Sequence, residues 1–210
     1  MVQFWVIAFV LIFAYLLGSI PTALIISRRI RQVDIRTIGD GNMGARNTFH
    51  QIGPKFGVIV AIIDFIKGAL PVLLAWVVGL SLGWQMLTGA LAIVGHDFPV
   101  FAHFRGGQGT ATSYGAMLVL FPLPTVVGLT IYGILFLIIR NSNISCGVGG
   151  ASIAIFLGIT HRWTLLGYAI GIFLFIPIKL FMDKPRRKAI QNANGSDSSE
   201  EDGLGGTFSV

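Results

Sequence analysis

Residues 95–112, GHDFPVFAHFRGGQGTAT, form a polar, glycine-rich turn between two strongly hydrophobic stretches. A second turn of this kind, GDGNMGARN, covers residues 39–47. Irregular backbone at the edge of a bilayer needs hydrogen-bond partners from protein, water or a ligand, because lipid tails supply none. The hydrophobic stretches therefore indicate a membrane protein, and the two turns are the first candidates for a functional site.

Hydrophobic residues make up 54% of the 210 residues, and charged residues only 11%, whereas an ordinary globular domain has about 25% charged residues. The apolar residues come in long blocks. A spanning helix needs about 20 such residues, and seven segments approach that length. They are residues 3–26, 56–80, 84–101, 109–121, 123–139, 145–160 and 163–182. The sequence predicts an all-α membrane protein with seven transmembrane helices.

The basic residues predict the orientation of these helices, because short loops rich in Lys and Arg stay in the cytoplasm. Alternate loops and the C-terminal segment hold Arg28, Arg29, Arg31, Arg36, Arg46, Lys55, Arg105, Arg140, Lys184, Arg186, Arg187 and Lys188. The intervening loops hold only Arg162. We therefore expect a multi-pass membrane protein, with the N terminus outside and with the C terminus and both glycine-rich turns in the cytoplasm. The basic residues behind the net charge of +6 then lie on the face next to anionic membrane lipids. Nucleic acid is the weaker explanation of this charge.

The rest of the composition sets further limits. The first hydrophobic segment lacks a basic start and a cleavage site, so we expect it to be retained. Residues 1–183 are predicted to form the membrane domain, and residues 184–210 a basic juxtamembrane stretch that leads into an acidic tail, disordered from Asn192 onward. Cys146 is the single cysteine. No Cys or His cluster has metal-ligand spacing, so neither a metal nor another cofactor is expected.

Two charges lie inside the second predicted span, where a charged side chain costs about 2.5–3.5 kcal/mol on insertion scales. Asp64 and Lys67 are three residues apart and share a helical face, so they can pair. The pair is either structural or part of the polar wall of a substrate cleft.

The turn at residues 39–47 has the composition of an anion-binding loop, since glycine exposes backbone N–H groups and asparagine and arginine add donors. Asp40 opposes this assignment, because its carboxylate repels an anion. The candidate phosphate ligands of this turn are Gly41, Asn42, Gly44, Arg46 and Asn47.

The second turn offers a glycine-rich backbone just before a helix start, where the helix dipole favours anions. Its candidate phosphate ligands are Gly106, Gly107, Gln108 and Gly109. His96 at its entry is either an acid–base group or a structural histidine, and Ser145 in a later turn either caps a helix or contacts a ligand. Further along, Gly128, Gly133, Gly158, Gly167 and Gly171 are expected to be helix-packing positions.

These motifs together resemble one family, the acyl-phosphate-dependent glycerol-3-phosphate acyltransferases of bacteria. The resemblance covers nearly the whole membrane domain. It lies in YLLGSIP at residues 15–21, VDIR at 33–36, GNMGARN at 41–47, Asp64 with Lys67 and Gly68, and residues 95–112. It implies seven spans with an outside N terminus in the bacterial inner membrane, and transfer of an acyl chain from acyl phosphate to the 1-hydroxyl of glycerol 3-phosphate, without metal.

Several positions depart from the pattern of that family. Asp40 replaces a serine, Arg46 a threonine, His50 an arginine and Gln108 a lysine, and residues 183–187 lack the family's C-terminal histidine. Arginine binds phosphate bidentately and lysine brings a full charge, whereas glutamine has only a dipole and histidine is mostly neutral at pH 7. Arg46 can replace one of the lost charges, and Ser145 matches a serine of the family.

The leading interpretation is an acyltransferase whose partners are acyl phosphate, glycerol 3-phosphate and membrane lipids. In it, both glycine-rich turns hold phosphates, Ser145 assists, His96 organises its turn, and these two are the candidate catalytic residues. One alternative is a divergent paralogue with another acceptor or no catalysis. Another is a small-solute transporter that uses Asp64 and Lys67, although it leaves the match in the turns unexplained. The sequence does not give the oligomeric state.

Overall fold

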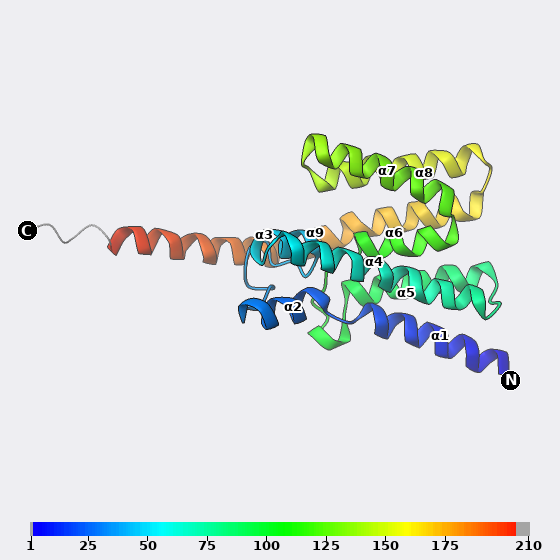
Figure 1. Ribbon diagram of the computed structural model, residues 1–210, viewed down its shortest axis with the longest axis horizontal. Helices are drawn as coiled ribbons and strands as arrows, with labels where there is room; N and C mark the ends of the chain where they lie inside the picture. The colour runs from blue at the N-terminus through cyan, green and yellow to red at the C-terminus, as the bar shows by residue number, and fades with distance from the viewer. Residues whose placement is uncertain (1, 205–210) are drawn as a thin grey trace, which may run out of the picture.

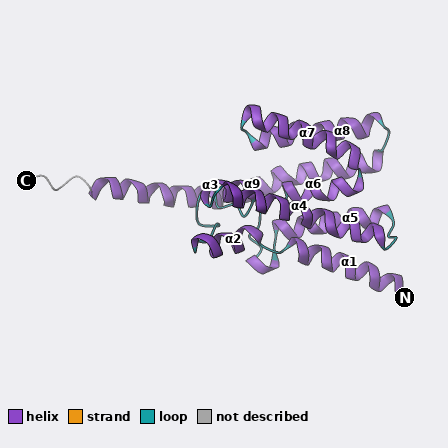
Figure 2. Ribbon diagram, in the orientation of Figure 1, coloured by secondary structure: helices purple, strands orange, loops and turns teal. Residues whose placement is uncertain are grey.

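The computed structural model describes residues 2–204, which fold as helices joined by short loops, with no strand among them (Figures 1 and 2). The elements are α1 (Val2–Gly18), α2 (Thr22–Arg31), α3 (Ala45–Gln51), α4 (Pro54–Val77), α5 (Leu82–Asp97), the 3-10 helix η1 (Val100–Ala102), α6 (Thr110–Leu120), α7 (Pro122–Ile139), α8 (Ser142–Ile159) and α9 (Trp163–Leu204). The prediction of an all-α protein is confirmed.

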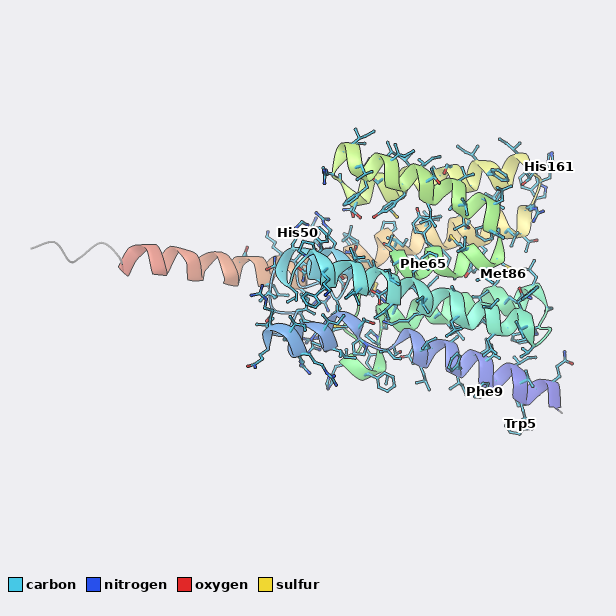
Figure 3. All side chains as sticks on the ribbon, in the orientation of Figure 1. Trp5, Phe9, His50, Phe65, Met86 and His161 are labelled. Atoms are coloured by element: carbon cyan, nitrogen blue, oxygen red, sulfur yellow. The ribbon has the colours of Figure 1, made fainter. Side chains whose placement is uncertain are left out.

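Seven of these helices, α1 and α4 to α9, run side by side along the long axis of the molecule (Figure 1). The short elements α2, α3 and η1 gather at one end, together with both glycine-rich turns and the α7–α8 connection. In Figure 3, His50 lies at this end and His161 at the opposite one. The loops that the charge pattern assigns to one side of the membrane therefore share one end of the bundle.

Five helical segments are long and apolar enough to cross a membrane: Gln3–Arg31, Pro54–Val77, Pro122–Ile139, Ser142–Ile159 and Trp163–Ile190. The other two bundle helices are shorter, with 16 residues in α5 and 11 in α6. A helix rises about 1.5 Å per residue, so neither of them matches the hydrocarbon thickness of about 30 Å by itself. The outer surface is apolar, and Trp5 and Phe9 are 68% and 63% exposed (Figure 3).

Glycine brings α4 and α6 into backbone contact. A Cβ atom at Gly68 would collide with the carbonyl oxygen of Thr112, and one at Gly115 would collide with the carbonyl oxygen of Phe65. Each glycine thus makes room for the backbone of the other helix. Small residues are the usual means of close helix contact in membranes, where lipid and side chain are equally apolar.

The same reciprocal contact recurs twice in the bundle. Gly18 and Gly95 join α1 to α5, and Gly128 and Gly149 join α7 to α8. Of the glycines that the sequence assigned to helix packing, only Gly128 is confirmed. The others face open space or a loose contact, so that assignment was wrong for Gly133, Gly158, Gly167 and Gly171. A glycine by itself does not reveal whether another helix lies against it.

An ion pair in the first loop ties residues 34–36 to the second glycine-rich turn. The Arg36 guanidinium donates to Asp34 through Nε and Nη2, at 2.9 and 2.6 Å, and its Nη1 donates to the Ala102 carbonyl at 3.2 Å. Arg28 also donates to Asp34, at 3.0 Å. The hydrogen bonds between Asp34 and Arg36 hold the pKa of Asp34 well below its ordinary value and raise the pKa of Arg36. Arg36 is thus a structural residue that links residues 34–36 to η1.

The C-terminal segment is helical as far as the structure describes it. The structure continues α9 as one helix to Leu204 (Figure 1), although the composition predicts disorder from Asn192. The last part of this helix extends away from the bundle (Figure 1), and an isolated helix is marginal in water. The division into two parts at residue 183 stays a prediction.

Replacing Gly68 with alanine is expected to destabilise the bundle, because the new methyl group has to displace the α6 backbone. Overpacking of this kind costs about 1–3 kcal/mol. Gly133→Ala is the matched control, since nothing lies within 4 Å of its added Cβ and alanine favours the helix. Thermal unfolding in detergent should give a lower midpoint for Gly68→Ala alone. Equal midpoints for both variants would contradict the close contact between α4 and α6.

Candidate active site

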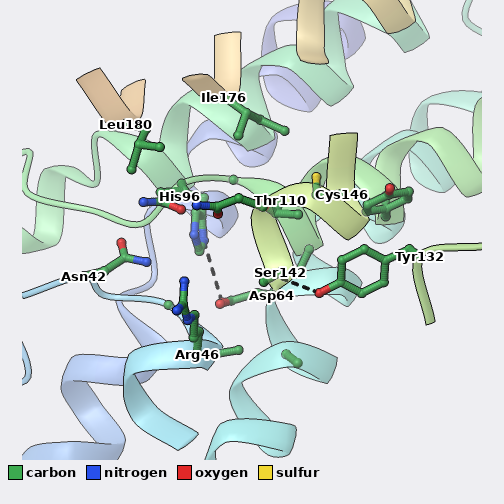
Figure 4. Close-up of a pocket in the computed structure, with 18 of the residues that line it drawn as sticks. Asn42, Arg46, Asp64, His96, Thr110, Tyr132, Ser142, Cys146, Ile176 and Leu180 are labelled. Atoms are coloured by element: carbon green, nitrogen blue, oxygen red, sulfur yellow. Dashed lines mark hydrogen bonds and ion pairs between the residues drawn. The ribbon is translucent and has the colours of Figure 1, made fainter. Parts of the chain in front are cut away.

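One cavity of about 480 Å³ opens among the first glycine-rich turn, α4, the start of α6, the α7–α8 connection and α9 (Figure 4). Its residues fall into a polar group at the end where the turns lie and an apolar group deeper in the bundle. Among the lining residues are Asp40, Asn42, Gly44, Arg46, Asp64, His96, Gln108, Gly109, Thr110, Tyr132, Ser142, Asn143, Cys146, Phe173, Ile176, Leu180 and Arg187.

The polar mouth carries two arginines from distant parts of the chain. Arg46 lies in the first turn of α3 and is exposed. It lines the cavity and has no hydrogen-bonding or ionic partner among the described residues, so its guanidinium can bind a ligand (Figure 4). Arg187 comes from α9 and donates to the Asp40 carboxylate. The Asp40 carboxylate also accepts the backbone N–H of Asn42, at 3.0 Å. Asp40 is therefore a paired carboxylate, which weakens its repulsion of an anion.

The start of α6 adds backbone donors to the same cavity. Gly109 has a φ of +64°, in the left-handed region, and it turns the chain so that Thr110 begins the helix. The first intrahelical bond runs from Ser113 N–H to the Gly109 carbonyl, at 2.7 Å. The N–H groups of Thr110 and Ala111, which line the cavity, precede that bond and have no acceptor within the helix. The positive end of the helix dipole thus faces the cavity.

The deeper wall is apolar and comes from three helices. Phe65 of α4, Leu129 of α7, and Phe173 and Ile176 of α9 line it. Tyr132 lies beside them, and its hydroxyl is 3.2 Å from the hydroxyl of Ser142. An apolar channel next to a basic mouth suits a molecule with a charged head and a hydrocarbon chain.

A buried group of charges supports the floor of the mouth. Lys67 donates to the Asp64 carboxylate at 2.8 Å and to the Ile20 carbonyl at 2.5 Å. The His96 ring nitrogen Nδ1 lies 3.7 Å from the same carboxylate. Asp64 and Lys67 thus form an ion pair, and Asp64 also lines the cavity. Both interpretations of this pair, structural and site-lining, hold in part.

The predicted site residues divide into two groups. The cavity is lined by Asn42, Gly44, Arg46, His96, Gln108 and Gly109. The remaining predicted residues do not line it and lie behind the lining; they are Gly41, Asn47, Gly106, Gly107 and Ser145.

Asn47 lies behind the lining because the first turn uses all of its polar atoms. Its Nδ2 donates to the carbonyls of Ile35, Ile38 and Asn42, each at 3.1 Å, and its Oδ1 accepts the Asp40 N–H at 3.2 Å. Asn47 is only 3% exposed. Its place is that of a buried support for the turn, and this geometry does not favour direct phosphate contact.

The other residues behind the lining also have local roles. Gly106 and Gly107 pack against His96, whose carbonyl oxygen and ring occupy the space where their side chains would begin. The Gly107 N–H donates to that carbonyl at 3.1 Å. Ser145 is fully buried, and its hydroxyl donates to the Asn141 carbonyl at 2.9 Å. Gly41 packs against the α9 side chain of Ile190.

Sequence reasoning missed several residues that line the cavity. Tyr132 lies in the apolar helix α7, and Ser142 and Asn143 lie at the start of α8. No sequence motif distinguishes these three residues. Arg187 was assigned only to the basic segment. Its partner, Asp40, is 147 residues away, so no local pattern links the two. Only the helix packing brings α9 to the first turn.

The chain is similar to known proteins over most of its length. The sequence profile named "Glycerol-3-phosphate acyltransferase" matches residues 8–187. The glycerol-3-phosphate acyltransferase of Endomicrobium trichonymphae is 38% identical over 165 residues, which are 79% of this chain and 80% of that protein. The Listeria monocytogenes enzyme of the same name is 38% identical over 168 residues, covering 78% and 83%.

A solved structure agrees with these sequence matches. The crystal structure of PlsY, an integral membrane glycerol 3-phosphate acyltransferase in its glycerol 3-phosphate form, is similar with a TM-score of 0.77 and 33% identity. The similarity covers 86% of this chain and 90% of that one. The chain therefore belongs to the glycerol-3-phosphate acyltransferase family.

Proposed function

We propose that this protein transfers an acyl chain from acyl phosphate to the 1-hydroxyl of glycerol 3-phosphate, which gives lysophosphatidic acid and inorganic phosphate. The observation that carries the proposal is a cavity that joins a basic mouth to an apolar wall, in a chain of this family. Related structures exist in glycerol 3-phosphate and lysophosphatidic acid forms, the acceptor and the product of this reaction.

Each part of the cavity suits one part of the substrates. The phosphate groups lie at the mouth, where Arg46, Asn42 and the N–H groups at the start of α6 donate to them. The acyl chain lies along the apolar wall near Phe173 and Ile176. This arrangement places the reacting carbonyl group of acyl phosphate between mouth and wall, beside the acceptor hydroxyl.

The reaction needs little covalent help from the protein, because acyl phosphate is already an activated anhydride. The acceptor oxygen attacks the carbonyl carbon, the bond from that carbon to the bridging phosphate oxygen breaks, and the hydroxyl proton leaves on the released phosphate. Positioning and electrostatic stabilisation by the mouth then supply much of the rate enhancement. Ser145 serves this site as a support, since its hydroxyl donates to the Asn141 carbonyl. The backbone carbonyl of His96 holds Gly107, while His96 also lines the cavity.

The topology that goes with this function has seven crossings, with the mouth on the cytoplasmic side. Seven helices run side by side, and the basic loops share one end of the bundle (Figure 1), which the positive-inside rule places in the cytoplasm. There the mouth has access to soluble glycerol 3-phosphate, while the apolar wall stays at the depth of the lipid chains. The plasma membrane is the compartment that fits this arrangement.

Arg46→Ala is expected to lower acyl transfer by at least a hundredfold, because it removes the unpaired cation of the mouth. Purified protein in lipid is assayed for phosphate release from long-chain acyl phosphate, with and without glycerol 3-phosphate, and the lipid product is identified by mass. Arg29→Ala serves as the control. Arg29 is also exposed and has no partner among the described side chains, but it lies outside the cavity. Full activity of a folded Arg46→Ala protein would remove Arg46 from the site.

Gln108→Lys tests the altered second turn and the divergent alternative. Gln108 lines the mouth, so a lysine there adds a full charge next to the phosphates and should lower the KM for a phosphorylated substrate about tenfold. His50→Arg is the matched control, because His50 is exposed, lies outside the cavity and packs against Phe49. A wild type without activity that gains transfer only through Gln108→Lys would point to the divergent paralogue.

A further inference from the structure

Arg187 reaches the cavity mouth from α9 and is fixed there by two contacts with the first turn. Its Nη2 donates to Asp40 Oδ2, in a pair whose side chains are 18% and 20% exposed. Three residues further along α9, the Ile190 side chain packs against Gly41. A polar and an apolar contact together hold this part of α9 against the turn that forms the mouth.

The contact with Asp40 leaves most of the Arg187 guanidinium free. The group has five N–H donors in a planar fork, and the bond to Asp40 runs from Nη2. Asp40 is the only hydrogen-bonding partner of Arg187 among the described side chains. Arg187 can therefore donate to a second anion while it stays bound to Asp40, as guanidinium groups do with carboxylates and phosphates.

We infer that Arg187 is a phosphate-binding residue of this enzyme, and that Asp40 positions it at the mouth. The inference rests on the proposed function. It accounts for two features of the mouth together. Gln108 brings no charge to the mouth, and Arg187 supplies a cation from another helix. Asp40, which by itself repels an anion, holds that cation where a substrate phosphate arrives.

The charge balance at the mouth supports this role. A phosphate monoester carries about −1.5 to −2 charges at pH 7, whereas Asp40 carries one. With Arg187 and Asp40 neutralising each other, Arg46 is the only other cation that lines the cavity mouth among the described residues. A phosphate that contacts both guanidinium groups obtains two charge-assisted partners. The phosphate belongs either to glycerol 3-phosphate or to acyl phosphate, which share this chemistry.

The competing possibility is that Arg187 only ties α9 to the first turn. A double-mutant comparison separates the two roles. Arg187→Gln is made in the wild type and in an Asp40→Asn background, where the tie is already broken. The KM of each phosphorylated substrate is measured with the other at saturation, so that the affected KM identifies the bound phosphate.

A phosphate-binding Arg187 predicts that Arg187→Gln raises one of these KM values about ten- to a hundredfold in the wild type, with a smaller change in kcat. The increase should be smaller but still present in the Asp40→Asn background, because the contact of Ile190 with Gly41 still keeps α9 at the mouth. Arg187→Lys should restore part of the affinity, since it keeps the charge. Lys188→Gln removes a neighbouring exposed charge outside the cavity and should leave both KM values unchanged. If Arg187→Gln has no effect in the Asp40→Asn background, Arg187 is a tie only and the inference is wrong.

Direct binding keeps this test separate from the proposed function. Equilibrium dialysis measures glycerol 3-phosphate and inorganic phosphate with the wild type and Arg187→Gln, without turnover. Weaker binding by the variant supports the phosphate contact even if the wild type transfers no acyl chain, in which case only the proposed reaction fails. Equal binding by both proteins, or no binding by the wild type, overturns the inference.

Discussion

Lys67 is 3% exposed near the middle of α4, and its ammonium group is held by the Asp64 carboxylate and the Ile20 carbonyl. A buried charge that loses its partner costs about 3–5 kcal/mol, so these contacts fix the parts of the chain that supply them. The Ile20 carbonyl lies at the break between α1 and α2, where Pro21 interrupts the helix. Asp64 in turn faces His96 at the end of α5. One buried cation thus aligns three segments beneath the cavity.

This alignment explains how irregular backbone survives close to the membrane. The helix α6 has only 11 residues, and the turn that precedes it is held by His96, whose carbonyl accepts the Gly107 N–H. Non-helical backbone at membrane depth is tolerated where it is buried in protein or lines a water-filled cavity. Residues 106–109 do both, because Gly106 and Gly107 pack on His96 while Gln108 and Gly109 line the cavity.

The parts of this structure that depend on local pattern could be predicted from the sequence. Hydrophobic blocks give the helices, and the glycine-rich turns give the position of the site along the chain. Side-chain direction could not be predicted, as Asn47 shows, because a buried amide inside a turn and a ligand-binding amide have the same sequence signature. Contacts between distant segments, such as that of Asp40 with Arg187, depend on how the helices pack. The sequence also did not show which glycines of α9 contact another helix, and no described residue of another helix lies within 4 Å of a Cβ atom added at Gly167 or Gly171.

The charges at the mouth also determine which chemistry this cavity can support. A carboxylate at residue 40 would oppose anionic substrates if it stood alone, but Arg187 and the Asn42 N–H both bind it. Such a paired site offers oriented donors rather than a strong nucleophile, and the Ser145 hydroxyl is committed to the Asn141 carbonyl. An acyl donor that is already activated needs no nucleophile from the protein, whereas an ester or amide donor would need one. The geometry therefore favours an anhydride donor such as acyl phosphate, whose leaving group is an anion that the basic mouth can bind.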